Sequence, residues 1–145
     1  MPADSLAKTV DLTGQLVTLR QLSLDVLDAY LEMLADPEGQ RLTATTQTFT
    51  REKIVDWLTT RAGTAGRSDW AIFERGTKDF AGEVVLNEFD EKKNSMNLRI
   101  ALRGPNWFGR GLGGEAIQLV LEHVFNTSSL SKITLEVLVD NARAI

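Results

Sequence analysis

The sequence contains no cysteine, and this absence excludes several kinds of chemistry before any motif is considered. Without thiols the chain has no disulfide bond, no thiolate metal site and no cysteine nucleophile. Histidine is almost as rare: His123 is the only one, and no partner stands at metal-ligand or catalytic-triad spacing from it. We therefore interpret His123 as a structural residue and expect no metal site.

Clusters of basic residues and long apolar runs are also missing. The chain has 16 Lys and Arg against 20 Asp and Glu, a formal net charge of −4. This balance argues against a surface that neutralises nucleic-acid phosphates. No apolar run approaches the length of a membrane span, and the first residues lack the basic and apolar stretches of a signal peptide. We therefore expect a cytoplasmic protein whose partners include neither nucleic acid nor a membrane.

The residues that are present indicate one globular domain over 1–145, with a 43% hydrophobic content that is sufficient for a core. Alternating apolar and polar residues over 69–74, 80–89 and 95–102, separated by short polar turns, predict an antiparallel meander. The other expected elements are a strand over 15–20, a helix capped by Ser23 and ended by Asp36-Pro37, a helix over 51–61, a helix over 113–126 and a strand over 132–139. The last strand, together with 95–102 and the helix between them, should form a right-handed parallel unit. The sequence therefore predicts an α+β (mixed α/β) fold, with a mixed, mostly antiparallel sheet flanked by helices.

Four of the 11 glycines fall within residues 109–114, directly before the amphipathic helix whose wet face includes Glu115. A glycine weakens a helix start by about 1 kcal/mol relative to alanine, so the cluster requires an explanation. Small residues let backbone N–H groups converge on an anion, and the helix N-terminus adds about half a positive charge. The alternative is a flexible loop in which the glycines only permit tight turns. We expect a phosphate-binding loop.

Residues 109–114 also match the dinucleotide-binding pattern GxGxxG literally. Residues 103–108, however, separate the glycines from the preceding strand, and only six residues follow Val139, too few for further βα units. No Lys-Ser/Thr pair follows the glycines, which excludes a P-loop. A dinucleotide-dependent oxidoreductase is therefore an alternative that would require NAD binding.

The order of motifs resembles the GNAT acetyltransferases, most closely their RimJ/RimL-like branch. Residues 98–102 correspond to the strand before the family's pyrophosphate loop, 109–113 to the loop, and Glu115-Ala116 to the helix start. Further similarity lies at 12–20, 36–38, 81–84 and 141–144. The resemblance implies a GNAT fold over nearly the whole chain. The family pattern continues past residue 145 into a further helix and strands, so we expect the C-terminal part of the fold to be missing.

The resemblance further implies an acyl-CoA-dependent N-acyltransferase, with acetyl-CoA as the default co-substrate and no metal. Backbone groups of the strand would pair with the pantetheine, and the loop amides would bind the pyrophosphate. Phe108 would border the phosphates, Arg110 would neutralise them or remain solvated, and Asn141 would contact the pantetheine or cap the next helix. The expected cofactor-binding residues are Ile100, Ala101, Leu102, Phe108, Gly109, Arg110, Gly111, Leu112, Gly113, Gly114 and Asn141.

The implied acceptor is a primary amine, with a protein N-terminus as the first expectation and small amines, amino acids and antibiotics left open. An alkylamine with a pKa near 10 costs about 4 kcal/mol to deprotonate at pH 7, so such a substrate needs a base. Glu83, expected in mid-strand beside the cleft, is the first catalytic candidate. Asn97 would position substrate or water, although both residues are alternatively ordinary sheet side chains. The only tyrosine, Tyr30, falls on the core stripe of the first helix, so no group is assigned to protonate the departing thiolate.

Two further possibilities remain open at this point. A CoA-binding module without catalysis would bind acetyl-CoA and acetylate no amine. An open sheet edge would also make a homodimer feasible.

Overall fold

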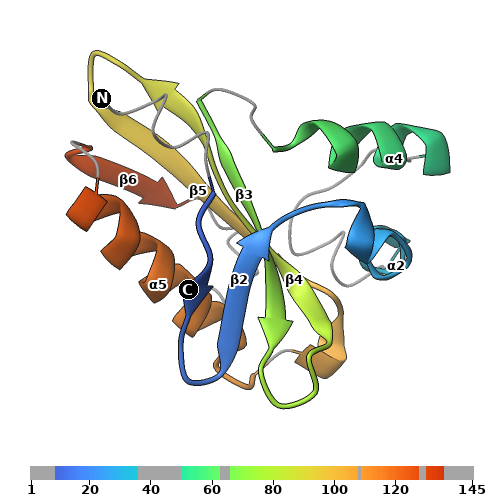
Figure 1. Cartoon of the computed structure of the whole chain (residues 1–145). Coiled ribbons are helices and arrows are strands. Elements are labelled where there is room, and N and C mark those ends of the chain that lie inside the picture. Colours follow the sequence, from blue (N-terminus) through green and yellow to red (C-terminus); the bar gives the residue numbers. More distant parts are fainter. Residues whose placement is uncertain (1–8, 36–49, 63–65, 108, 128–129, 136–145) are drawn as a thin grey trace.

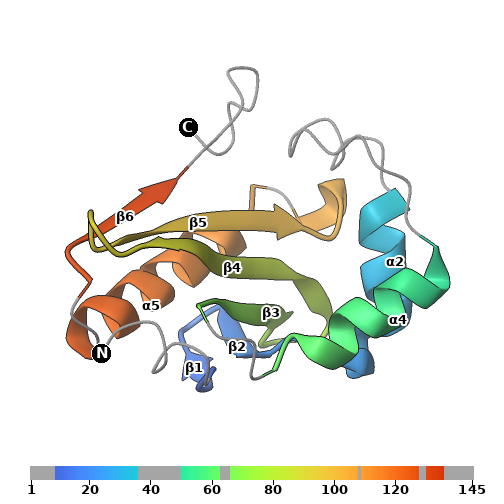
Figure 2. The ribbon, with the colours of Figure 1, turned by 90° about the horizontal axis from the view of Figure 1, so that it is seen from above.

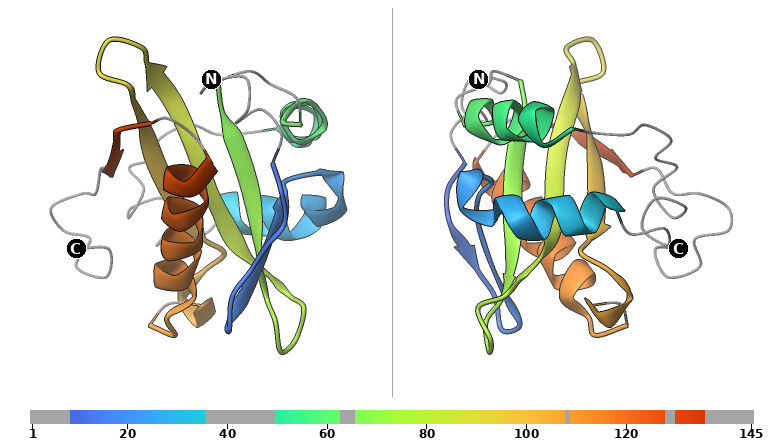
Figure 3. Two further views of the ribbon diagram at one scale, coloured as in Figure 1. Left: turned by 60° about the vertical axis from the view of Figure 1, so that its left-hand side comes forward. Right: turned by 90° about the vertical axis from the view of Figure 1, so that its right-hand side faces the viewer.

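The computed structural model describes residues 9–35, 50–62, 66–107, 109–127 and 130–135. Its six strands form one sheet in the order β1-β2-β3-β4-β5-β6. One face of this sheet is covered by helix α5 and the opposite face by helices α2 and α4 (Figures 1 and 3). This arrangement confirms the predicted α+β fold with helices flanking a mixed sheet.

The described elements follow the predicted order. The strands are β1 (Leu12–Thr13), β2 (Val17–Gln21), β3 (Ser68–Glu74), β4 (Phe80–Asp90), β5 (Ser95–Leu102) and β6 (Lys132–Leu135). The helices are α2 (Leu27–Ala35), α4 (Arg51–Thr60) and α5 (Leu112–Thr127), with 3-10 turns η1 (Leu24–Val26) and η2 (Pro105–Trp107). The predicted helix end at 36–37 and the predicted strand residues 136–139 lie outside the described residues.

The sheet is antiparallel from β1 to β5, and β6 runs parallel to β5. Both the meander and the parallel strand–helix–strand unit are therefore confirmed. Strand β1 was not predicted, because a two-residue strand carries no alternation of its own. A doubly wound dinucleotide fold requires a mostly parallel sheet. The GxGxxG pattern therefore occurs in this sequence without the dinucleotide-binding fold.

Two hydrogen-bonded caps explain where the first helices begin. The Ser23 side chain accepts from the N–H of Asp25 at 3.3 Å, which starts the 3-10 turn leading into α2. The Thr50 side chain accepts from the N–H of Lys53 at 3.2 Å and starts α4. Each cap satisfies a helix donor that has no partner within its own helix. The prediction of Ser23 as a cap is confirmed.

The core consists of two apolar clusters, one on each face of the sheet. Figure 2 shows the helices that cover them, α5 on one face and α2 and α4 on the other. The cluster under α5 contains Trp70, 1% exposed, whose ring meets His123 edge-to-face at 6.1 Å. The cluster under α2 and α4 contains Tyr30, as its place on the core stripe predicted. The packing of His123 on Trp70 supports its interpretation as a structural residue. No helix among the described residues has both the length and the apolar content needed to cross a membrane.

Strands β4 and β5 approach closely at Gly82, which has a φ of +154°. A Cβ at this position would collide with the carbonyl oxygen of Ala101 and lie 2.8 Å from the Cα of Leu102. Glycine is required here both for space and for a backbone conformation that other residues rarely adopt. The contact places the end of β5, which carries part of the expected site.

Replacing Gly82 with alanine should therefore destabilise the fold by roughly 2–5 kcal/mol, from backbone strain and steric overlap together. The free energy of unfolding in urea measures this loss. Gly76→Ala is the matched control, because a Cβ at Gly76 would meet nothing within 4 Å. Equal stability of the two variants would contradict the assigned role of Gly82.

Candidate functional site

The glycine-rich segment forms the start of α5. Gly109 and Gly111 have φ values of +70° and +80°, in the left-handed region that favours glycine. The carbonyl of Gly111 accepts the first helical hydrogen bond, from the N–H of Glu115 at 3.1 Å. The N–H groups of the three residues between Gly111 and Glu115, namely Leu112, Gly113 and Gly114, have no acceptor among the described residues. Three backbone donors are thus available at the positive end of a 16-residue helix.

The end of β5 has a free edge within the described part of the chain. The N–H of Arg103 donates to the carbonyl of Ala81 on β4 at 2.7 Å. Because backbone groups alternate between the two sides of a strand, the peptide groups of Ala101 face β4. Those of Ile100 and Leu102 therefore face the opposite side.

Strand β6 pairs with only the first half of this opposite side. Its register runs from Ser95 opposite Lys132 to Leu98 opposite Leu135. Beyond Leu98, no described strand lies beside β5 on the side away from β4. Within the described residues, the N–H and C=O groups of Ile100 and Leu102 therefore have no strand partner, and an additional extended chain could pair with them.

Gly113 joins these two features into one site. A Cβ on Gly113 would lie 3.4 Å from Cδ1 of Ile100 and 3.8 Å from Cδ1 of Leu102. The helix start therefore lies directly against the end of β5. Leu112 anchors it by burying its side chain in the core under α5.

The guanidinium of Arg110 lies toward the β3–β4 hairpin. It forms an ion pair with Glu74, and its Nη1 donates to the carbonyl of Asn106 at 3.2 Å. Its charge is therefore matched by a carboxylate of the chain in this structure. Phe108 and Asn141, two of the expected cofactor-binding residues, lie outside the described residues.

Glu115 is not on the wet face of α5, which corrects the sequence analysis. Its carboxylate accepts from the N–H groups of Gln15 and Leu16 at 2.7 Å and of Val17 at 2.8 Å. It occupies the space that a side chain at Gly14 would fill, 2.6–2.8 Å from the Cβ position. Glu115 thereby holds the β1–β2 hairpin against the start of α5. Its partners are about 100 residues away in the sequence, so no local pattern announces this contact.

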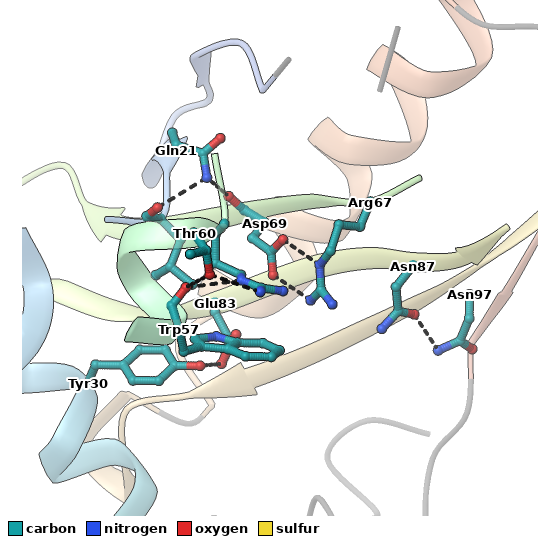
Figure 4. A network of polar contacts seen from close by, with 11 residues as sticks. Gln21, Tyr30, Trp57, Thr60, Arg67, Asp69, Glu83, Asn87 and Asn97 are labelled. Atoms are coloured by element: carbon teal, nitrogen blue, oxygen red, sulfur yellow. Dashed lines mark hydrogen bonds and ion pairs between the residues drawn. The ribbon is translucent and has the colours of Figure 1, made fainter. Parts of the chain in front are cut away.

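Glu83, which was expected in mid-strand beside the cleft, is buried beneath α2. It is 3% exposed, and the Tyr30 hydroxyl donates to its Oε2 at 2.7 Å (Figure 4). Its Oε1 is buried without a hydrogen-bond partner in the described structure. Burial raises the pKa of Glu83, and the charge of Arg99 offsets this only in part. Burial also raises the pKa of Tyr30, and the neighbouring Glu83 carboxylate raises it further.

Asn97 links three strands on the same face of the sheet as Glu83. Its amide nitrogen donates to Oδ1 of Asn87 on β4 at 3.5 Å (Figure 4). Its Oδ1 accepts from the Thr134 hydroxyl on β6 at 3.3 Å. The residue is thus held in place beside the point where β6 stops pairing with β5. Among the described residues, no three His, Asp or Glu side chains are grouped so as to hold a metal ion.

Replacing Glu115 with glutamine should weaken the fold, because an amide cannot accept from the three N–H groups as a carboxylate does. We expect a loss of about 1–3 kcal/mol in the free energy of unfolding. Glu122→Gln is the control on the same helix, since Glu122 is exposed and accepts one side-chain hydrogen bond from Gln118. Losses of the same size in the two variants would contradict the assigned contact.

The pH dependence of stability tests the burial of Glu83. A group whose folded-state pKa is raised stabilises the fold fully below its unfolded-state pKa and loses this contribution as the pH rises through the folded-state pKa. Glu83→Gln keeps an acceptor for Tyr30 but does not ionise. The variant should therefore gain stability relative to the wild type as the pH rises above the unfolded-state pKa of a glutamate, about 4.3. Glu91→Gln, in an exposed turn, is the comparison variant, and a difference for Glu83→Gln that does not change with pH would refute the prediction.

Comparison with known proteins gives one consistent family. Residues 17–145 match the family described as acetyltransferase (GNAT) domain. The N-acetyltransferase p20 of Bacillus licheniformis is 22% identical over 132 residues, which cover 89% of this chain and 74% of that protein.

Solved structures of acetyltransferases have a similar fold. A structure described as an acetyltransferase from T. thermophilus is 26% identical, with a TM-score of 0.76 and coverage of 94% of this chain and 71% of that one. Spermidine N-acetyltransferase from Vibrio cholerae, in complex with CoA and spermine, is 20% identical with a TM-score of 0.78. That alignment covers 90% of this chain and 76% of the other.

Proposed function

Because this chain belongs to the GNAT acetyltransferase family, we propose that it transfers an acetyl group from acetyl-CoA to a primary amine, either a protein N-terminus or a small amine. One observation carries the proposal. The free N–H groups at the start of α5 lie beside the free edge of β5, so that an anion site adjoins a site for an extended chain.

Both parts of this arrangement suit the chemistry of CoA. The pyrophosphate is an anion, and the N–H groups of Leu112, Gly113 and Gly114 are available to it. The pantetheine arm carries amides, which can pair with the peptide groups of Ile100 and Leu102 as an added strand would. The thioester would then lie farther along β5, toward Leu98.

The reaction forms one C–N bond and breaks one C–S bond. The amine nitrogen attacks the thioester carbonyl carbon, CoA leaves as a thiolate that takes up a proton, and the nitrogen loses a proton. An outward N–H on β5, such as that of Ile100, is a candidate donor to the developing oxyanion. For Glu83 we assign proton acceptance through its free Oε1 by way of a water molecule, because the carboxylate is buried. Asn97 would position the acceptor.

The second candidate function is acyl-CoA binding without catalysis. It is favoured by the burial of Tyr30, which leaves no described tyrosine exposed to protonate a departing thiolate. Such a module would bind acetyl-CoA with the same residues and release no free CoA in the presence of any amine. Measurement of CoA thiol release therefore separates the two functions.

Gly114→Asp tests the anion site, because it should move binding and stability in opposite directions. A Cβ at Gly114 would meet nothing within 4 Å, and a carboxylate in the first helical turn stabilises a helix by about 0.3–1 kcal/mol. The same carboxylate would repel a pyrophosphate at the free N–H groups. We expect the affinity for acetyl-CoA, measured by calorimetric titration, to fall at least about tenfold.

Gln118→Asp is the matched control, since it adds the same charge one turn farther along the exposed side of α5. Its affinity for acetyl-CoA should stay close to that of the wild type. Unchanged affinity in folded Gly114→Asp would refute the placement of the pyrophosphate.

A further inference from the structure

Arg99 is an exposed arginine in the second half of β5. It pairs with Val85 of β4, and Ala101, two residues along, packs under α2 and α4. Since alternate residues of a strand share a face, Arg99 lies on that same face. It forms no ion pair or hydrogen bond with the described residues. An exposed charged side chain with no hydrogen bond or ion pair among the described residues is available to a ligand.

Two buried carboxylates among the described residues of this face, Glu83 and Asp69, form no ion pair with Arg99. Glu83 is its diagonal neighbour on β4, but this carboxylate is buried and hydrogen-bonded to Tyr30. Asp69 on β3 is fully buried in a two-bond ion pair with Arg67, at 2.8 and 2.7 Å. Both acids are thus held by other partners, and Glu83 interacts with Arg99 through its charge alone, without a hydrogen bond or ion pair.

A second arginine adds to the positive charge of this face. Arg61 lies over the Trp57 ring at 3.7 Å from its centroid and donates to the carbonyl of Trp57 at 3.0 Å. It has no carboxylate partner among the described residues. A polycation would therefore meet two arginines on this face, neither of which has a carboxylate in an ion pair within the described residues. An anionic group would be attracted by the same two arginines.

The position of Arg99 along β5 relates it to the proposed reaction. It follows Leu98, where pairing with β6 ends, and precedes Ile100, whose peptide groups face the free edge. On the proposed function, the thioester lies at this point, and an amine that attacks it brings its other substituents near Arg99. An arginine there can bind a carboxylate through two parallel N–H donors.

We propose that the acceptor is a small primary amine that carries a carboxylate, as a free amino acid does, and that Arg99 binds this carboxylate. The inference rests on the proposed function and narrows it to one class of amine. Arg99 is then a residue that determines specificity, and a polyamine is a poor substrate.

The test measures free CoA released from acetyl-CoA by the full chain with three kinds of acceptor: individual L-amino acids, their C-terminal amides, and spermidine. An amide keeps the amine and side chain but removes the negative charge. We expect acetylation of at least one amino acid, with kcat/KM at least about tenfold above that of its amide and of spermidine. Arg99→Gln should raise KM for the acid by about 10- to 100-fold and leave KM for the amide nearly unchanged.

Two further variants sharpen the test. Arg99→Lys keeps the charge without the two-donor geometry and should fall between the wild type and Arg99→Gln. Arg20→Gln should have no effect, since Arg20 is an exposed arginine on the same face but on β2, stacked over Phe73. At a pH at which Glu83 is protonated, the urea midpoint of Arg99→Gln should equal that of the wild type.

Several results would overturn the proposal. They are equal turnover of acid and amide, efficient turnover of spermidine, an equal effect of Arg99→Gln on acid and amide, or acetyl-CoA binding with no amino acid acetylated. A lowered urea midpoint would show that Arg99 has its partner within the chain and would overturn it as well. Failure of the wild type to bind acetyl-CoA would instead refute the proposed function itself.

Discussion

The candidate site depends on the contact between the Glu115 carboxylate and the β1–β2 hairpin. A carboxylate in the first turn of a helix interacts favourably with the helix dipole, and it could also occupy the helix donors itself. Here the Glu115 carboxylate lies toward the β1–β2 hairpin and accepts hydrogen bonds from three of its N–H groups, from Gln15 to Val17. The negative charge is satisfied there, while the N–H groups of residues 112–114 keep no acceptor among the described residues. One side chain thus fixes the helix start on the sheet without filling the position that an anion needs.

Two glycines bring the remaining parts into register with this helix start. Gly82 lets β5 lie tightly along β4, and Gly113 lets the start of α5 lie against Ile100 and Leu102. Interiors are close-packed, so a shift of either contact by the width of a methyl group would move the strand edge relative to the helix. The glycines that matter for geometry are therefore different from those that keep the loop uncovered. Gly114 meets nothing within 4 Å and belongs to the second group.

The sequence predicted what is encoded locally and missed what depends on distant partners. Alternation over 69–102 was sufficient for the meander, and the order of motifs along the chain was sufficient for the family. The role of Glu115 was missed because its partners lie near residue 16. The burial of Glu83 was missed because it depends on α2 packing over β4. For Ile100, Ala101 and Leu102, the resemblance indicated exposed backbone, but only the pairing of Arg103 with Ala81 shows which peptide groups face outward.

The alternation of residues along β5 assigns the donor and the acceptor of the proposed reaction to different groups of the strand. The peptide groups of Ile100 and Leu102 face the edge where the donor would lie, whereas the side chains of Asn97 and Arg99 face the acceptor side. Because Arg99 lies close to Glu83, binding of the acceptor at Arg99 would also affect proton transfer at Glu83. Of the charges around Glu83, Arg99 is the one that lowers its pKa most. A carboxylate bound to Arg99 would offset this influence and raise the pKa of Glu83 further. The residue that selects the acceptor would therefore also shift the protonation of Glu83, so that binding of the acceptor and the charge state of the candidate base are linked.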